Sequence, residues 1–127
     1  MTQRTVQPPP VQGQGHHPLD VDTMREGARR LLVEDAEPLT ADELSTLTAQ
    51  LRGHVAVAVP DVETMALALP EDDVPRACAL ACVGEARMRL SLEPGPGLPA
   101  GIAHAQRLAR SVNALVDHYE NLSGSDR

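Results

Sequence analysis

Three side chains that could take part in acid–base or ligand-binding chemistry lie on two stretches with helical periodicity. His54 lies among apolar residues of one stretch, and Glu85 and Arg89 are one helical turn apart on the next. A buried imidazole needs a polar partner, and Glu85 is the acid placed to supply it. The residue types suit general acid–base catalysis, but their spacing is not diagnostic of an enzyme. We predict a polar cluster of His54, Glu85 and Arg89 inside the protein, either a structural network, which we favour, or a ligand-binding site.

The two cysteines, Cys78 and Cys82, are four residues apart and therefore share one face of a helix. At this spacing the Cβ atoms are about 5–6 Å apart, too far for an unstrained disulfide. A metal site would need His54 or His104 from other helices, and the spacing is not that of a zinc ribbon. We interpret both thiols as small buried residues in tight packing, and we expect neither a metal nor a cofactor.

His104, Ser111 and His118 recur every seven residues along a further stretch. The residue types suggest a nucleophile and its base, but successive members are about 10 Å apart along a helix axis, beyond hydrogen-bond reach. This spacing excludes a catalytic triad within one helix. We interpret the three residues as a stripe at the boundary between core and solvent.

Composition narrows the classes of function. The 127 residues include no Phe or Trp, one Tyr and 11 basic residues, all of them Arg, and the net charge is -7. A negative charge and few aromatic rings disfavour direct nucleic-acid binding. No apolar run reaches the roughly 18 residues needed to cross a bilayer, and no secretory signal is visible. With only two cysteines, we expect a cytoplasmic protein without a membrane partner.

The elements that would position these side chains are helices, because apolar residues recur with a period near 3.6 and never alternate over a useful length. Asp20, Thr40 and Asp73 are the expected N-caps, and Thr40 forms a capping box with Glu43. We predict an all-α fold, an antiparallel four-helix bundle. The expected helices span residues 21–36, 41–69, 74–92 and 98–122.

These helices make up one bundle domain at residues 20–122. Residues 1–19 are rich in Pro, Gln and Gly and show no periodicity, which is typical of a disordered tail. Residues 123–127 are expected to be a disordered C-terminus.

Two of the expected helices have unusual sequences. Pro60 lies within the second, but the apolar residues keep one phase across it. We therefore predict a single long helix with a kink at about residues 56–60, the alternative being two stacked helices. The third helix is almost entirely small and apolar between Ala77 and Ala86, which predicts a buried helix with neighbours on more than one side.

The second helix also predicts an interaction surface. Ala49, Ala56, Pro60 and Leu67 project from the side opposite its core stripe. Apolar residues that remain on a surface favour contact with another protein, and a homodimer is one form of that contact.

Five blocks of the sequence stand out together: residues 51–54 (LRGH), 69–77 (LPEDDVPRA), 83–87 (VGEAR), 95–98 (GPGL) and 108–122 (LARSVNALVDHYENL). Together they resemble a family of small actinobacterial (Streptomyces-type) proteins of unknown function labelled natural product biosynthesis proteins. The resemblance covers about residues 20–122 and implies an actinobacterial, cytoplasmic protein connected with specialised metabolism. The family names no reaction or catalytic residue, so none is carried over.

The sequence therefore predicts a non-enzymatic helical accessory or binding protein that acts through a protein partner or a homodimer surface. The alternative is a protein that binds or converts a small-molecule metabolite in a pocket around His54, Glu85 and Arg89. Whether the protein is an enzyme is left open.

Overall fold

The computed structural model describes residues 18–33 and 37–124. It contains four helices, and no strand occurs within those two ranges, so the predicted all-α fold is confirmed. The predictions of disorder for residues 1–17 and 125–127 lie outside the described residues. The helices are α1 (Val21–Leu32), α2 (Ala41–Leu67), α3 (Val74–Ser91) and α4 (Leu98–Gly124).

Side-chain caps start three of the helices where the sequence predicts. The Asp20 carboxylate accepts a hydrogen bond from the backbone N–H of Thr23 at the start of α1. Thr40 and Glu43 form the reciprocal capping box of α2, at 3.0 and 2.9 Å. Asp73 caps α3. Each cap satisfies N–H groups that have no partner within the helix.

The ends of the packed domain differ from the prediction by a few residues. Leu19, expected in the tail, is buried, and its N–H donates to the Tyr119 hydroxyl at 3.2 Å. The helix predicted to reach residue 36 ends at Leu32, because Val33 has an extended backbone, with ψ of 132°. Residues 34–36 lie outside the described part. At the other end, α4 continues to Gly124.

Helix α2 runs without interruption through Pro60, which confirms the prediction of one long helix over two stacked ones. A proline removes the hydrogen bond to the carbonyl of the residue four positions earlier, here Ala56. Pro60 and Ala56 are both exposed, so water can satisfy that carbonyl. The kink stays a prediction.

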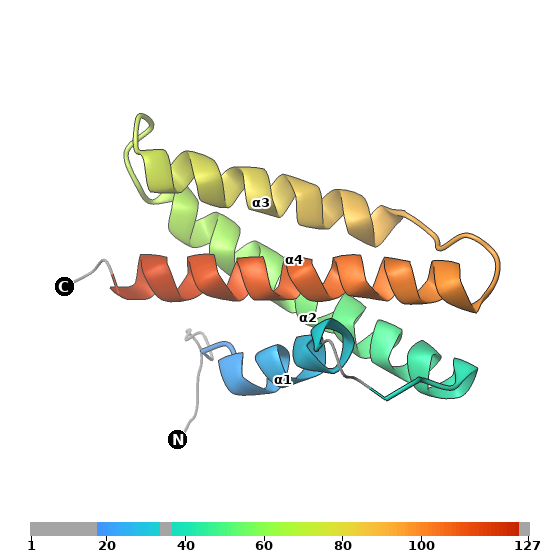
Figure 1. The fold of residues 1–127 in the computed structure, drawn as a ribbon. Helices are drawn as coiled ribbons and strands as arrows, with labels where there is room; N and C mark the ends of the chain where they lie inside the picture. The colour runs from blue at the N-terminus through green and yellow to red at the C-terminus, as the bar shows by residue number, and fades with distance from the viewer. Residues whose placement is uncertain (1–17, 34–36, 125–127) are drawn as a thin grey trace, which may run out of the picture.

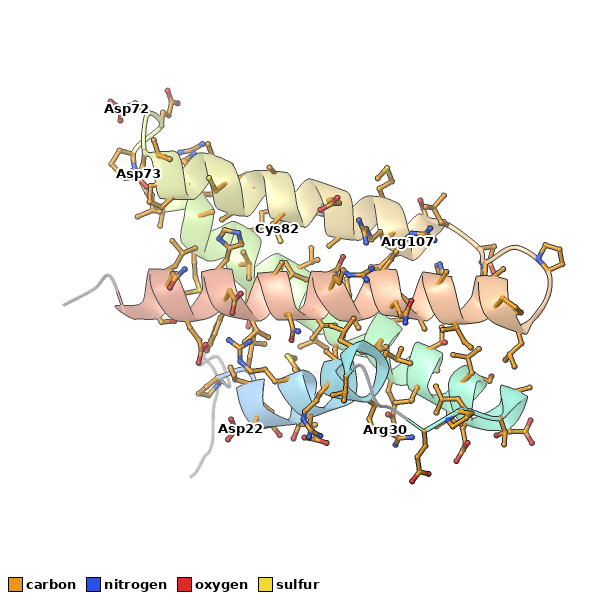
Figure 2. All side chains as sticks on the ribbon, in the orientation of Figure 1. Asp22, Arg30, Asp72, Asp73, Cys82 and Arg107 are labelled. Carbon is orange, nitrogen blue, oxygen red and sulfur yellow. The ribbon has the colours of Figure 1, made fainter. Side chains whose placement is uncertain are left out.

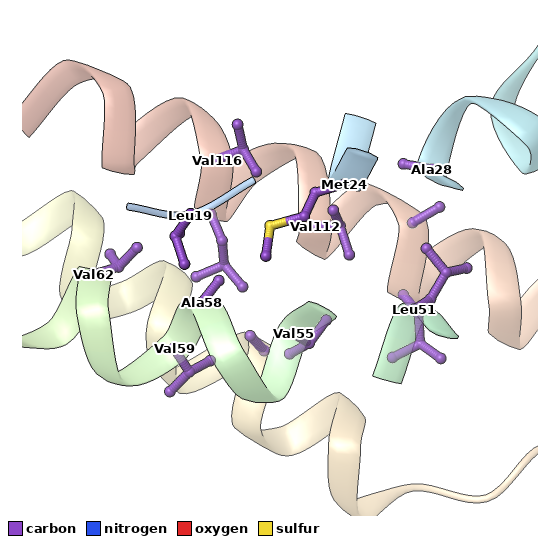
Figure 3. Packing of buried hydrophobic residues seen from close by; sticks show 14 of the residues in the cluster. Leu19, Met24, Ala28, Leu51, Val55, Ala58, Val59, Val62, Val112 and Val116 are labelled. Atoms are coloured by element: carbon purple, nitrogen blue, oxygen red, sulfur yellow. The ribbon is translucent and has the colours of Figure 1, made fainter. Parts of the chain in front are cut away.

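Helix α4 is the centre of the molecule. It packs against the other three helices, whereas α1 and α3 make no contact with each other in the described ranges. In Figure 1, α3 and α4 lie side by side and run in opposite directions, α2 crosses α4 obliquely, and α1 lies across α4 from α3. Figure 3 shows the core between α1, α2 and α4, where Met24, Val55 and Val112 meet.

The expectation of a fully buried third helix is wrong. Helix α3 buries only Ala79, Val83 and Ala86, and its outer side is exposed, Val74 by 70%. The reason is that α3 packs only on α2 and α4 within the described ranges, which leaves the rest of its surface exposed. Small apolar residues on the outer side cost little when exposed, because each presents little area to water.

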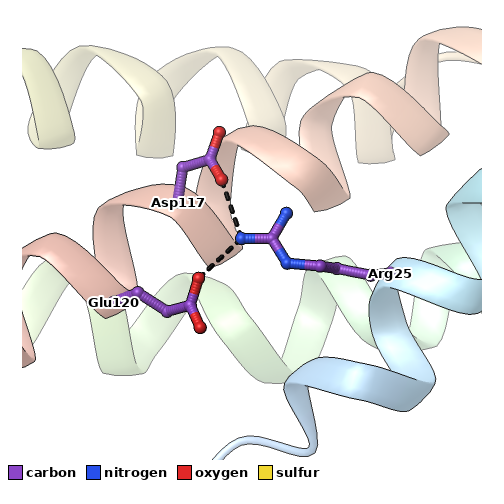
Figure 4. Close-up of polar contacts among 3 residues, drawn as sticks. All are labelled: Arg25, Asp117 and Glu120. Carbon is purple, nitrogen blue, oxygen red and sulfur yellow. Dashed lines mark hydrogen bonds and ion pairs between the residues drawn. The ribbon is translucent and has the colours of Figure 1, made fainter.

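An ion-pair cluster joins α1 to the central helix. The Arg25 guanidinium contacts the carboxylates of Asp117 and Glu120 on α4, at 2.8 and 2.6 Å (Figure 4). These hydrogen bonds raise the pKa of Arg25. Because all three groups are exposed, the cluster fixes the position of α1 more than it contributes to stability. None of the helices in the described ranges has the length and apolar character that a membrane span requires.

Candidate functional site

The structure places His54 on the flank of α2 that faces α1. Its imidazole is half-buried and lies beside Gly27, so that a Cβ added to Gly27 would be 3.6 Å from Nε2 of His54. The sequence predicted His54 on the apolar side of α2, but with its polar partner on the third helix.

The predicted contact between His54 and Glu85 is not formed. Helix α3 packs along the other flank of α2, where Arg87 pairs with Glu63 at 2.7 Å. Glu85 is exposed and pairs with Arg89, one turn later, at 3.1 Å. The predicted cluster is therefore divided: His54 is turned to α1, while Glu85 and Arg89 are turned toward α4.

Arg89 connects α3 to the central helix. Its side chain is only 21% exposed, and it donates a hydrogen bond to the backbone carbonyl of Arg107 on α4 at 3.0 Å. Of the three predicted residues, Arg89 alone lines one of the hollows described below.

The cysteines do not form a site. Cys78 is exposed, contrary to the prediction that both thiols are buried, because it lies on the outer side of α3. Cys82 is half-buried, and burial raises the pKa of its thiol, with a further contribution from Glu85. Within the described ranges no three His, Cys, Asp or Glu side chains are grouped so as to hold a metal ion.

A hollow of about 400 Å³ lies where α2 and α4 meet the loop between α3 and α4. A Cβ on Gly101 would lie only 3.0 Å from Leu44, so the missing side chain allows α4 to approach α2 closely here. The lining combines hydroxyls, one guanidinium, one carboxylate and apolar side chains: Ala41, Leu44, Ser45, Thr48, Ala49, Arg52, Glu93, Pro94, Gly101 and His104.

A second hollow, of about 260 Å³, lies beside the same loop and is lined by residues of α3 and α4 as well as of the loop. It shares Glu93, Pro94 and His104 with the first and adds two guanidinium groups, Arg89 and Arg107. Figure 2 labels Arg107 between α3 and α4 near the end where the two helices are joined. The two hollows therefore meet at Glu93, Pro94 and His104, and His104 is the one of these three that lies on a helix.

His104 is the unusual residue of this region. It is only 6% exposed, and its Nε2 is buried without a hydrogen-bond partner among the described residues. Burial lowers the pKa of His104, and the charges of Arg52 and Arg107 lower it further, against the opposing effect of Glu93. Burying a polar atom without a hydrogen-bond partner lowers the stability of the fold. Such an atom therefore indicates either that a further group binds there or that the fold accepts the loss of stability.

The sequence analysis considered His104 as a metal ligand beside the cysteines and interpreted it as a boundary residue, and it missed Arg52. His104 and Ser111 are buried and His118 is half-buried, because α4 is covered on more sides than a peripheral helix. Arg52 donates to the backbone carbonyl of Leu90 at 2.6 Å, a contact between residues 38 positions apart. The sequence signal for Arg52 was its place inside the LRGH block beside His54.

A second candidate region is an apolar surface shared by α2 and α3, the α2–α3 face. The Glu63–Arg87 ion pair crosses between the two helices within it. Ala49, Ala56, Pro60 and Leu67, which the sequence predicted to project from α2, are exposed, and Ala49 lies in the lining of the first hollow. The face consists of Ala56, Val57, Pro60 and Leu67 of α2 and Val74, Ala77, Cys78, Ala81, Gly84 and Met88 of α3.

Comparison with known proteins identifies the family but no activity. No curated protein and no solved structure matches the chain. Residues 22–124, which hold all four helices apart from the first residue of α1, match the DUF6415 family. The chain therefore belongs to DUF6415, a family of unknown function.

Proposed function

We propose that this protein is a non-enzymatic helical binding protein that acts through its α2–α3 face. The partner that binds this face is a second copy of the chain. The observation that carries the proposal is the exposure of large apolar side chains on two adjacent helices. Val57, Leu67, Val74 and Met88 are exposed by 56, 52, 70 and 55%. Apolar residues scattered singly on a surface need no explanation, but several on two helices that pack against each other favour an interface.

The charge of the face supports pairing between like copies. The chain carries a net charge of -7, so two copies repel each other unless they meet through a surface with little charge of its own. Within the face, the carboxylate of Glu63 is paired with the guanidinium of Arg87, which lowers the pKa of Glu63. A two-fold axis through such a face would place its apolar residues against their own equivalents.

The cellular setting is part of the same proposal. The resemblance to actinobacterial proteins labelled natural product biosynthesis proteins supports a cytoplasmic accessory role in specialised metabolism. A binding protein of this kind would form a complex either with a second copy of itself or with an enzyme. A partner of a different sequence on the α2–α3 face is the competing occupant.

The alternative function, a metabolite-binding protein, is favoured by a separate observation. The polar pocket expected around His54, Glu85 and Arg89 is divided, but Arg89 lines the second hollow together with His104. A small-molecule site would therefore centre on His104.

Sedimentation equilibrium tests the dimer. We expect wild-type protein to be dimeric, and Leu67→Glu and Ala81→Glu to be monomeric with an unchanged helical circular dichroism spectrum, because both residues are exposed. Val33→Glu is the matched control, since Val33 is an exposed apolar residue at the end of α1, outside the face. A monomeric wild type, or variants that stay dimeric, would contradict the proposal.

A further inference from the structure

Positive charge collects around the two hollows in a protein that is otherwise acidic. Arg52, Arg89 and Arg107 line them, and Glu93 is the one carboxylate in either lining. The chain as a whole carries a net charge of -7, so this concentration of guanidinium groups is not a consequence of composition.

Two of these guanidinium groups are not neutralised by the protein. Arg52 is bonded to the Leu90 carbonyl and has no carboxylate partner among the described residues. The side chain of Arg107 makes neither a hydrogen bond nor an ion pair within the same ranges. Arg89, in contrast, is paired with Glu85. Arg52 and Arg107 therefore remain able to bind an anion.

Both guanidinium groups that have no carboxylate partner in the described ranges lie close to one buried imidazole ring. Arg52 and Arg107 are each near enough to His104 to disfavour its protonated form, and the Nε2 atom of His104 has no hydrogen-bond partner. An anion placed where the two hollows meet would interact favourably with both guanidinium groups. It would also lie beside an imidazole with an unused hydrogen-bonding position.

The rest of the first hollow suits an apolar group. Leu44, Ala49 and Pro94 form part of its lining, and its volume of about 400 Å³ lies within the range of small-molecule sites. If the anionic group of a ligand lies at His104, the apolar part of the same ligand lies along these side chains. Ser45 and Thr48 add hydroxyl groups that can donate or accept hydrogen bonds.

We propose that the hollows around His104 bind a small organic carboxylate, with its carboxylate between Arg52 and Arg107 and its apolar body against Leu44 and Pro94. A carboxylate fits better than a phosphate because Arg52, Arg107 and Glu93 together carry a net charge of +1, which a monoanion neutralises, whereas the second charge of a dianion would be desolvated without compensation. The site is separate from the α2–α3 face, so it does not depend on the proposed dimer.

Binding has a consequence for His104 that a purely apolar ligand would not produce. The charge of the carboxylate favours the protonated imidazole, so the pKa of His104 rises when the site is filled. The groups that face the ring are Arg52 from α2, Glu93 from the α3–α4 loop and Arg107 from α4. The negative charge of the ligand opposes the effect of Arg52 and Arg107, which lower the pKa of His104, and acts in the same direction as Glu93, which raises it.

Titration followed by ¹H–¹⁵N NMR, with sodium hexanoate as the probe, tests the proposal. We expect saturable shifts at the amides of Arg52, Gly101 and His104, and a rise of the His104 pKa measured from its ring protons. Hexanamide has the same shape without the charge, and it should bind about tenfold more weakly because a charge-assisted hydrogen bond is lost. Pentylphosphonate at alkaline pH, where it is doubly ionised, should also bind more weakly than hexanoate at the same pH.

Matched variants assign the binding to the named groups. Arg107→Gln should weaken hexanoate binding about tenfold without disturbing the fold, since the Arg107 side chain is exposed and makes no bond in the described part. Arg110→Gln, an exposed arginine on the same helix outside both hollows, and His54→Ala should leave the affinity unchanged.

Three results of the affinity measurements would overturn the proposal. They are the absence of saturable binding, equal affinity for hexanoate and hexanamide, and tighter binding of pentylphosphonate. Shifts confined to Leu67, Ala81 and Met88 would place the probe on the α2–α3 face and would overturn it equally.

Discussion

The imidazole of His54 on α2 lies beside Gly27 of α1, so close that a Cβ on Gly27 would be 3.6 Å from Nε2. This contact turns the histidine away from α3 and from Glu85. It also leaves the ring only half-buried, so that His54 can reach water and does not require a carboxylate partner.

Replacing Gly27 by alanine is expected to stabilise the protein by about 0.5–1 kcal/mol. A Cβ at 3.6 Å makes an ordinary van der Waals contact with His54, while alanine removes the conformational cost of glycine within a helix. Urea unfolding measures the change. Gly97→Ala is the contrasting control and should be destabilising, because Gly97 has a φ of 93°. A loss of stability in Gly27→Ala would show that α1 and α2 cannot accommodate the methyl group.

The stability of the protein is expected to fall as the pH drops below about 6.5, and His104 is the cause. Because the pKa of His104 is lowered in the folded state, the unfolded chain takes up a proton that the folded chain does not. The free energy of unfolding is therefore constant above about pH 6.5 and decreases from there down to the lowered pKa.

Urea unfolding of wild type and His104→Gln between about pH 5 and 8 checks this prediction. The variant should lose the dependence on pH in this window, whereas His118→Gln on the same helix should keep it. The carboxylates with lowered pKa, Asp20, Glu43 and Glu63, lose their contribution only at more acidic pH. An unchanged slope in His104→Gln would contradict the assignment.

Truncation of a core residue of the central helix is expected to be much more costly than truncation on the α2–α3 face. Leu108 is fully buried on α4, and Leu108→Ala should cost about 2–5 kcal/mol. Leu67 is 52% exposed, and Leu67→Ala should change stability by less than about 0.5 kcal/mol in the monomer. Thermal unfolding at low protein concentration distinguishes them. Similar losses in both would mean that Leu67 is buried in solution.

Removing the charge of Arg25 is expected to cost about 0.5–1 kcal/mol at low salt and less at high salt. The guanidinium bonds two carboxylates of α4, but all three groups are exposed and screened by ions. Urea unfolding of Arg25→Gln at low and high salt measures the effect, and Arg110→Gln should show none. A cost that does not depend on salt would indicate lost packing instead of a lost ion pair.

Local signals were enough to predict most of the fold. Thr40 with Glu43 identifies the start of α2, and the constant apolar phase across Pro60 identifies its continuity. Both depend on neighbouring residues in the chain. The exposed position of Ala56, Pro60 and Leu67 followed from the same periodicity.

The candidate site was harder to predict because it depends on which helix is central. The composition of α3 suggested a buried helix, but α4 occupies that place, so His104 is buried and Cys78 is not. The bond from Arg52 to the Leu90 carbonyl and the approach of Gly101 to Leu44 join residues that are distant in sequence. Periodicity gives the face on which such residues lie but not the neighbour they meet.

The absence of contact between α1 and α3 in the described ranges has a consequence for the partial unfolding of the protein. Helix α1 can detach by losing its contacts with α4 and α2 alone, while α3 keeps every neighbour it has. The arrangement therefore allows a partial unfolding in which α1 opens and the other three helices stay packed together. Both the hollows at His104 and the α2–α3 face belong to that surviving unit.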